Sequence, residues 1–475
     1  MTTSIPTRII LILTATMLLL SYSTYAAAVE LRPSGTVIVF TQWATGTDLG
    51  FESPYSEPGL DEDFRGAQRL YFYLDINPHD EVSATAFMEV DNVWGGTEPG
   101  NIGTLAGGQV GSDGVNVATK NLFMTWRPKS LPLTMRAGIY GLALPNQIGG
   151  NLIIYDDVAT IVANYKISDE MCTTVLWARP YADNPTQGSP HSSMDFFAAT
   201  YSLQNHNHTM TPYIAVARFG RNVSGDPLGS AWSDGGNFGM WNGFSDFSGF
   251  PYAFWAAFSG KFHLGTEFTL LTDLLWGTLD GGSSAASRQG AILLAELDWM
   301  LPYMTVGVIG WWASGDSASA YKDGAGRMPF LSNQWGLTDF GYYRSSLDTE
   351  SNLILQDATG RWTVGLIVDD LQWTHTLSSM LKVLYMRGTN NPDIVKNNRF
   401  SPALLEGGYR NNWGTYLTTH DWLIEVDSDT TLELQENLSL IWRTGYIHIE
   451  VDPEVWGTND TKDAFRTALL LTYTY

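Results

Sequence analysis

The sequence predicts an all-β protein: a transmembrane, antiparallel up-and-down β-barrel of about 18 strands, with 16 as the other possible number. Three observations lead to this prediction. Segments with alternating polarity repeat along the chain, short and long connections alternate between them, and the last segment ends in an aromatic residue. A strand that crosses a membrane needs about 9–11 residues, whose side chains face lipid and lumen in turn.

The N-terminus predicts export. One positive charge within residues 1–8 precedes a short apolar stretch at 9–20, and three alanines follow at 26–28. This is the layout of a secretory signal peptide, and the apolar stretch is too short for a spanning helix of about 20 residues. We expect residues 1–28 to be a signal peptide and residues 29–475 to form a single transmembrane β-barrel domain.

The composition suits a surface that faces both lipid and water. Charged residues make up 16% of the chain, below the roughly 25% of ordinary soluble domains, and aromatic residues make up 13%. Composition alone leaves open a large soluble β-sandwich. The net charge of −23 argues against a nucleic-acid partner and weakly against an anion-selective pore. A single cysteine, Cys172, excludes an intramolecular disulfide.

Alternating polarity defines the expected strands. They are Gly35–Trp43, Gly66–Asn77, Glu81–Val93, Val115–Trp126, Pro132–Leu142, Asp157–Ile167, Met171–Tyr181, Ser193–Leu203, Thr209–Phe219, Phe250–Phe262, Thr266–Leu279, Arg288–Met300, Tyr303–Ser314, Gly360–Leu371, Thr376–Gly388, Thr418–Leu434, Leu438–Val451 and Ala464–Tyr475. In the last of these, aromatic and leucine side chains occupy one face and the chain stops at Tyr475. A terminal aromatic on such a strand resembles the assembly signal of outer-membrane barrels, although phenylalanine is commoner there.

The connections favour a barrel over a soluble sandwich. Every even-numbered segment that is followed by another ends in a connection of about two to five residues, and every odd-numbered one in a longer connection. About 30 residues follow Phe219 and about 45 follow Ser314. Outer-membrane barrels have short periplasmic turns at one rim and long external loops at the other. A soluble sandwich has no reason to sort its loops in this way.

A barrel of this size predicts a pore. In lipid every backbone polar group must be paired within the protein, and closure at 16–18 strands leaves a lumen too wide for side chains to fill. Only six residues separate the expected cleavage site from the first strand, so we see no plug domain. We therefore expect a water-filled channel for passive diffusion of small hydrophilic solutes and ions, in the outer membrane of a Gram-negative bacterium.

Alternation also predicts which side chains face the lumen, because a basic residue on the lipid face at mid-depth costs about 2–4 kcal/mol. The residues assigned to the pore lining are Arg69, Asp75, Arg136, Arg218, Lys261, Glu267, Asp273, Glu296, Arg361, Lys382, Asp421, Glu425, Asp427, Asp429, Glu433 and Arg443. Five of the acidic ones form a row on one strand. Acids and bases on different walls would set a transverse field that favours polar solutes. The segments 303–314 and 171–181 do not fit the alternation.

The connection Ala143–Asp156 is a candidate constriction loop. It is unusually apolar for an external loop, with Ile148, Leu152, Ile153 and Ile154. One hypothesis is that it folds into the lumen and presents Asp156 and Asp157 at a constriction. The alternative is an external loop that packs on a neighbouring subunit.

Several short motifs resemble a known family. They are Leu144-Pro145-Asn146, Gly149-Gly150, Asp156–Ala159, Ile424–Asp427, Glu436–Leu438, Asp452, Trp456-Gly457, Asp463–Phe465 and Tyr473–Tyr475. Together they resemble the homotrimeric outer-membrane porins of sulfate-reducing bacteria, the Desulfovibrio-type porins. The resemblance implies a trimer of barrels that passes small hydrophilic solutes by diffusion. It brings no catalytic residues.

Other functions find less support in the sequence. A barrel lipase would need Ser, His and a polar orienting group together, and a pairing such as His448 with Ser439 can always be found in a chain with many serines. His206 and His208 could hold a metal ion, but no third ligand is evident. We therefore expect no enzyme activity, no metal and no cofactor. The expected partners are outer-membrane lipid, lipopolysaccharide, small hydrophilic solutes and further copies of the chain in a homotrimer.

Two alternative functions remain. One is a solute-selective channel for sugars or organic anions, which an aromatic row facing the lumen would favour; Tyr71 and Tyr73 are the candidates. The other is a structural or adhesive barrel without an open pore, which the long loops would also suit.

Overall fold

The computed structural model describes residues 30–46, 62–94, 117–182, 193–220, 250–331, 335–337, 340, 358–396, 416–457 and 461–475. The expected signal peptide, residues 1–28, lies outside the described residues. Among the described residues, no helix is long and apolar enough to cross a membrane.

The described residues form one antiparallel sheet of 18 strands, which confirms the predicted fold class and strand number. The strands are β1 (Glu30–Thr45), β2 (Glu62–His79), β3 (Val82–Val93), β4 (Val117–Trp126), β5 (Leu133–Ala143), β6 (Tyr155–Lys166), β7 (Met171–Ala182), β8 (Ser193–Gln204), β9 (His208–Phe219), β10 (Tyr252–Leu264), β11 (Phe268–Asp280), β12 (Arg288–Leu301), β13 (Met304–Ala313), β14 (Arg361–Gln372), β15 (Leu377–Gly388), β16 (Trp422–Gln435), β17 (Leu438–Glu450) and β18 (Ala464–Thr474). Each overlaps one predicted segment, and the ends differ by a few residues.

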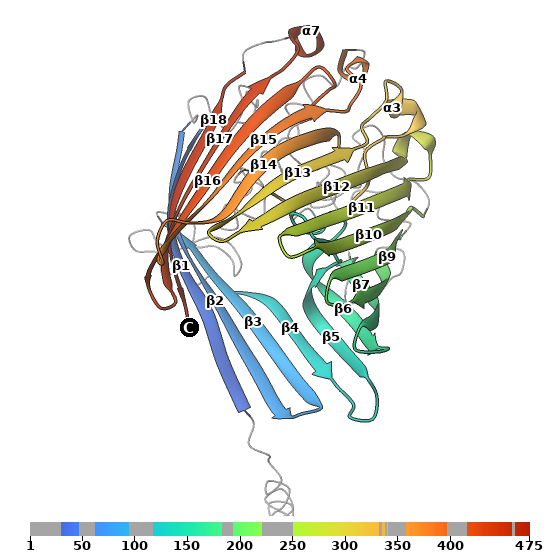
Figure 1. Ribbon diagram of the computed structural model, residues 1–475. Helices are drawn as coiled ribbons and strands as arrows, with labels where there is room; N and C mark the ends of the chain where they lie inside the picture. Colours follow the sequence, from blue (N-terminus) through green and yellow to red (C-terminus); the bar gives the residue numbers. More distant parts are fainter. Residues whose placement is uncertain are drawn as a thin grey trace, which may run out of the picture.

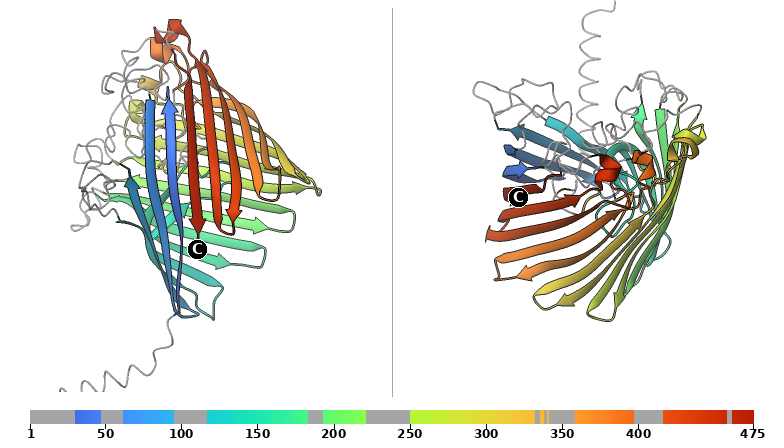
Figure 2. Two further views of the ribbon diagram at one scale, coloured as in Figure 1. Left: turned by 90° about the vertical axis from the view of Figure 1, so that its left-hand side faces the viewer. Right: turned by 90° about the horizontal axis from the view of Figure 1, so that it is seen from above.

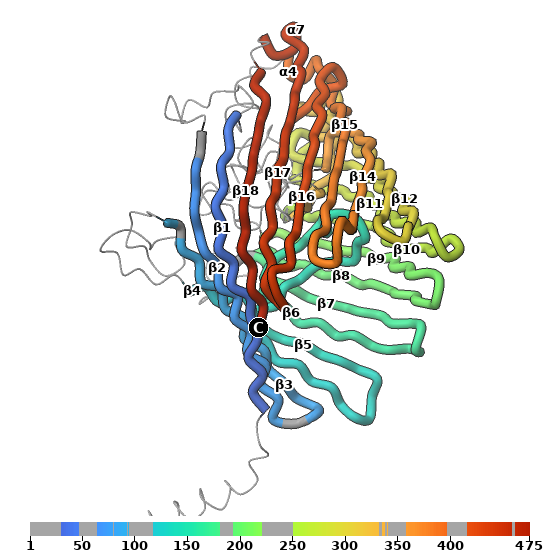
Figure 3. The backbone as a smooth tube through the Cα atoms, turned by 60° about the vertical axis from the view of Figure 1, so that its left-hand side comes forward, coloured from blue at the N-terminus to red at the C-terminus, as the bar shows by residue number. Residues whose placement is uncertain are grey.

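The sheet closes on itself. Each strand pairs with the next in sequence, and β18 pairs with β1 from Thr36 opposite Thr474 to Thr45 opposite Phe465. Figures 2 and 3 show β1 and β18 side by side. Closure leaves no edge strand, so the ladder can satisfy the backbone groups of every strand without water.

The two ends of the barrel differ as the connections predicted. Short turns such as 80–81, 205–207 and 302–303 join β2 to β3, β8 to β9 and β12 to β13 at one end. Long connections, which the structure describes in part, join the odd-numbered strands to their successors at the other end, here called the long-loop rim. The short helices η3 (Ser284–Ala286), α3 (Ala320–Asp323), α4 (Asp393–Lys396) and α7 (Pro453–Trp456) belong to these connections, and α3, α4 and α7 lie at this rim (Figure 1).

The outward face of the barrel is apolar. On β12, Leu293 and Leu297 are exposed outward, whereas Leu294 between them is buried. Aromatic rings gather near both rims: Phe268 stacks on Trp299 near the short turns, and Tyr385 stacks on Trp422 near the long-loop rim. An apolar band between two aromatic girdles is the surface that a bilayer requires.

The two segments that resisted the alternation have a physical explanation. On β13 the inward residues Ile309, Trp311 and Ala313 are as apolar as the outward Val308 and Trp312. They are apolar because loops pack against them from inside, so this wall faces protein and not water. The same cluster of buried side chains includes Leu176 and Ala178 of β7. Alternation therefore fails where the interior is filled.

Candidate functional site: the inner wall and the loops against it

A loop from the third long connection lies against the inner wall of the barrel. The buried carboxylate of Asp273, on β11, accepts hydrogen bonds from the backbone N–H of Gln147 at 3.0 and 2.9 Å and of Ile148 at 2.8 Å. Asn151 donates to the Tyr213 hydroxyl on β9 at 3.2 Å. Because a buried carboxylate is costly without donors, these bonds fix the position of the loop on this wall.

A second segment packs on the same loop. The Trp335 indole donates to the Ile148 carbonyl at 3.1 Å, and the Leu331 N–H donates to the Ile153 carbonyl at 2.7 Å. Lys382 of β15 donates to the Leu337 carbonyl at 2.7 Å. The strands β8–β15, here called the apolar wall, thus meet two layers of loop.

The backbone of the loop needs glycine at this contact. Gly149 has φ +71°, and a Cβ atom there would come within 2.7 Å of the Trp335 indole nitrogen. Asn151 completes the turn, since its side-chain oxygen accepts from the N–H groups of Ile153 at 2.7 Å and Ile154 at 2.9 Å. The apolar side chains that looked anomalous for an external loop are buried here.

The opposite part of the ring, β2–β5, carries charges inward and is here called the charged wall. Arg69 and Asp91 form a two-pronged ion pair with both N···O distances at 2.6 Å, and Glu89 lies 3.6 Å from the same guanidinium. Lys120 reaches Asp157 of β6 at 3.2 Å. Such short bidentate pairs are among the stronger interactions of this kind.

The charged wall also carries a row of aromatic rings. Tyr73 and Phe87 stack with centroids 4.1 Å apart, and Phe123 meets Tyr140 edge-on at 5.1 Å. The Arg136 guanidinium lies over both rings of the second pair and donates to the Tyr140 hydroxyl at 2.7 Å. No carboxylate pairs with Arg136 in the part of the chain that the structure describes. Tyr73 is 37% exposed, so part of this row is accessible.

Most of the predicted lining residues lie on the inner faces of their strands, as the burial of alternate residues shows. They are Arg69, Asp75, Arg136, Lys261, Asp273, Glu296, Arg361, Lys382, Glu425, Asp427, Asp429 and Arg443. Glu433 is exposed beside a bulge near the short turns. The role of these residues in lining a pore remains a prediction.

The prediction that Arg218 lines the pore is wrong. It lies on the outer face of β9, the face of the exposed Ile214, while Tyr213 and Phe219 are buried on the inner face. Both faces of β9 are mainly apolar, so the charge of Arg218 was the only feature that predicted which face of this strand points into the lumen. That reasoning fails at the end of a strand, where an outward charge costs only about 0–1 kcal/mol.

Two acidic residues that were predicted to line the pore also lie elsewhere in the structure. Glu267 lies in the turn before β11, exposed, where it accepts a hydrogen bond from the outward Trp299 indole at 3.4 Å. Asp421 precedes β16 and is fully buried at the long-loop rim. It accepts from the Thr418 N–H at 2.7 Å and the Trp456 indole at 2.9 Å, so it holds two connections together.

Asp156 and Asp157 belong to β6 and not to the loop before it. As consecutive strand residues they point to opposite faces. Asp157 accepts from the Asn121 amide at 2.5 Å and pairs with Lys120, whereas Asp156 stands opposite Leu142. They cannot act as one adjacent pair, and their presence at a constriction remains a prediction.

The sequence analysis missed Glu89, Asp91 and Lys120, which complete the charged wall. Alternation along β3 could have found the two acids, since Phe87, Glu89 and Asp91 share a face. Lys120 could not be found in this way, because β4 bulges between Asn121 and Thr119 and the alternation breaks there.

The structure does not assemble the lipase pairing. Ser439 and His448 lie near opposite ends of β17, and His448 instead contacts the Asp463 carboxylate at 2.7 Å. Within the described residues, no group of three or more His, Cys, Asp and Glu side chains could hold a metal ion.

Comparisons with known proteins identify the architecture. No family model and no curated protein matches the sequence significantly. Among solved structures, a BenF-like porin from Pseudomonas fluorescens matches with TM-score 0.53 and 12% identity, over 94% of this chain and 99% of that one. OpdL of Pseudomonas aeruginosa matches with TM-score 0.52 and 12% identity, over 94% and 99%. OccK8 (OprE) of the same organism matches with TM-score 0.52 and 10% identity, over 94% and 98%. These likenesses establish that the chain has the fold of these porin structures, a closed antiparallel β-barrel.

Proposed function

We propose that the protein is an outer-membrane porin, a channel for passive diffusion of small hydrophilic solutes and ions across the outer membrane of a Gram-negative bacterium. The observation that carries this proposal is the closed 18-strand barrel whose outward face is apolar while β2–β5 carry charges inward. A barrel of this size is too wide for its own side chains to fill. The loop against the apolar wall occupies part of the lumen on that side.

Further details of the proposal rest on the sequence. Residues 1–28 are the signal peptide and residues 29–475 the barrel domain. The motif resemblance supports a homotrimer of the Desulfovibrio type. The outward aromatic girdles support contact with outer-membrane lipid and lipopolysaccharide.

A second candidate, a channel selective for organic anions, is favoured by one specific observation. The Arg136 guanidinium lies over the rings of Phe123 and Tyr140 on the inner wall, and no carboxylate pairs with it among the described residues. A cation framed by rings suits a flat solute that carries a negative charge. This candidate differs from the first in requiring a solute to bind and to compete with ions.

The first experiment is single-channel recording of the purified mature protein in a planar bilayer under a salt gradient. Stepwise openings in linked triplets are expected from a trimeric pore, and the sign of the reversal potential reports its ion preference. A correctly folded protein that never conducts would overturn the porin proposal. Benzoate and glucose are then added separately: block by benzoate that is lost in Arg136→Ala would support the selective channel, and no block by either supports general diffusion.

A further inference from the structure

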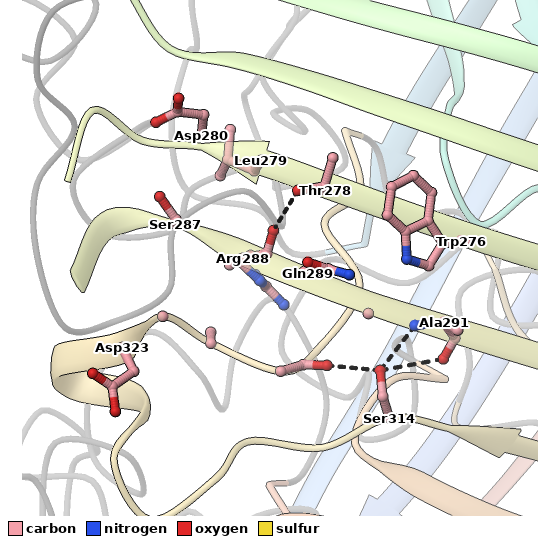
Figure 4. A pocket seen from close by; sticks show the side chains of 14 residues that line it. Trp276, Thr278, Leu279, Asp280, Ser287, Arg288, Gln289, Ala291, Ser314 and Asp323 are labelled. Carbon is pink, nitrogen blue, oxygen red and sulfur yellow. Dashed lines mark hydrogen bonds between the residues drawn. The ribbon is translucent and has the colours of Figure 1, made fainter. Parts of the chain in front are cut away.

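A cavity of about 590 Å³ opens on the outer side of the long-loop rim, where the ends of β11 and β12 meet the segment 323–326 (Figure 4). Its position follows from the strand register. Trp276 stands opposite Ala291 and Thr278 opposite Gln289, on the same face as the outward Leu274. The volume is within the range of about 300–1,000 Å³ of small-molecule sites.

The cavity exists because β13 is shorter than β12. β13 ends at Ala313, opposite Ile292, and the first residues of β12 pair instead with Ala325. The Gln289 N–H donates to the Ala325 carbonyl at 3.0 Å, and the Ala325 N–H donates to the Ser287 carbonyl at 2.9 Å. The segment thus continues the sheet and forms one side of the cavity.

The close approach of this segment is built into the chain. Gly324 has φ +101°, and a Cβ atom there would lie 2.9 Å from the Ser287 carbonyl oxygen. The Ser314 hydroxyl donates to the Gly326 carbonyl at 2.6 Å and accepts from the Ala291 N–H at 2.9 Å. Both ends of segment 324–326 are therefore held to the barrel.

The lining offers hydrogen-bonding groups and one aromatic face. The side chains of Gln289 and Asp323 and the Trp276 indole N–H form no hydrogen bond within the described part of the chain. Asp280 uses one oxygen to accept from the Gly282 N–H at 2.9 Å, which leaves the other oxygen. Trp276 is 37% exposed, so its ring is accessible from outside the barrel.

The charges of the lining select the class of ligand. Its basic residue, Arg288, is buried and donates to the carbonyls of Arg327 and Met328 on the inner side. The two carboxylates of the lining, Asp280 and Asp323, disfavour an anion. Carboxylates and an amide accept and donate to hydroxyl groups, and an indole ring packs against the C–H face of a ring molecule.

We propose that this cavity binds a neutral saccharide unit, with Trp276 as the stacking surface and Gln289, Asp280 and Asp323 as partners of its hydroxyl groups. The site is independent of the lumen and goes beyond the proposed channel function. The saccharide could come from free solution or from a glycolipid of the outer leaflet, because the site lies on the lipid-facing side at the rim.

The test uses saturation-transfer-difference NMR on the folded full-length mature barrel in a detergent without a sugar headgroup. Glucose and maltotriose are the free probes, and ethanolamine and calcium chloride are the cationic competitors. Trp276→Ala and Gln289→Ala are the site variants. Trp312→Ala is the matched control, because Trp312 is another exposed tryptophan of the outer face that does not line the cavity. Heat-modified gel mobility confirms that each variant is a folded barrel.

We expect saccharide signals that weaken at least tenfold in both site variants and persist in Trp312→Ala. Signals from either free probe support a soluble source. If the free probes are silent, the same variants are compared in nanodiscs with and without lipopolysaccharide, and protection of the rim from proteolysis that depends on Trp276 supports a lipid-linked source. Silence in both formats, saccharide binding that survives Trp276→Ala, or displacement by ethanolamine or calcium would overturn the proposal.

Discussion

The charged wall and the apolar wall belong to one sheet with one alternation, yet their interiors differ. On β2–β5 the inward residues are ion pairs and aromatic rings. On β8–β15 they are mainly alanine, leucine, isoleucine and tryptophan, and loops pack on them. Loops pack against the apolar wall from inside, and two of its charged residues, Asp273 and Lys382, bond to the loop backbone. The comparison teaches that the inward face of a barrel strand reflects what it touches, and that loops can fill the interior of a barrel from one side.

The largest expected effect is a difference in the free energy of unfolding lost when an aromatic side chain is removed from each of the two walls. Trp311 is buried in the apolar wall and meets Trp335 edge-on at 5.3 Å, so Trp311→Ala should destabilise the barrel by about 3–5 kcal/mol. Tyr73→Ala on the charged wall should cost about 1 kcal/mol, the scale of a ring pair. Urea unfolding in phospholipid vesicles measures both. Equal losses would mean that the two interiors are packed alike.

The next effect concerns the attachment of the loop. The carboxylate of Asp273 accepts three N–H···O contacts from the loop. Asp273→Asn removes its negative charge and replaces one accepting oxygen with an amide NH₂ group, which cannot accept from the backbone N–H groups. The loop should lose about 1.5–3 kcal/mol of attachment, with faster proteolysis at 144–154 and noisier conductance. Asp75→Asn is the control, because Asp75 accepts from Thr85 at 2.6 Å on the charged wall. Unchanged proteolysis in Asp273→Asn would show that apolar packing alone holds the loop.

A third prediction contrasts two inward cations. Removing a positive charge from a water-filled lumen favours cations, so Arg136→Ala should shift the reversal potential toward cation selectivity with a stability change under about 1 kcal/mol. Lys382→Met should act mainly on stability, by about 1–3 kcal/mol, because its ammonium is bonded to the Leu337 carbonyl. Planar-bilayer recording and urea unfolding are applied to both variants. A pure stability effect in Arg136→Ala would place that residue outside the conducting path.

The accuracy of the sequence analysis follows from how local each signal is. Strand number and connection order were predictable because alternation and loop length are written along each segment. Arg218 and Glu267 were misassigned because both lie near a strand end. There the cost of a charged side chain that points outward depends on its depth in the membrane, and no local sequence pattern encodes that depth. The loop N–H groups that bond to Asp273 come from more than a hundred residues away, and the bulge at Lys120 depends on the pairing of β4 with β3. Such contacts exist only once the ring has closed.

The smallest expected effect lies at the long-loop rim beside β16 and β17. A hydrogen bond from His420 at 2.5 Å, and a second from the Glu454 N–H at 2.8 Å that caps α7, lower the pKa of Asp452 from its ordinary value. A lowered pKa adds stability that is present above about pH 3.9 and is lost as the pH falls through the folded-state value. Asp452→Asn should therefore hasten proteolysis of the rim at pH 6, and its difference from the wild type should shrink toward pH 3. Because Asp452 and His420 are solvent-accessible, the change should be smaller than those above, and a gap of equal size at both pH values would assign it to the lost cap and not to the charge.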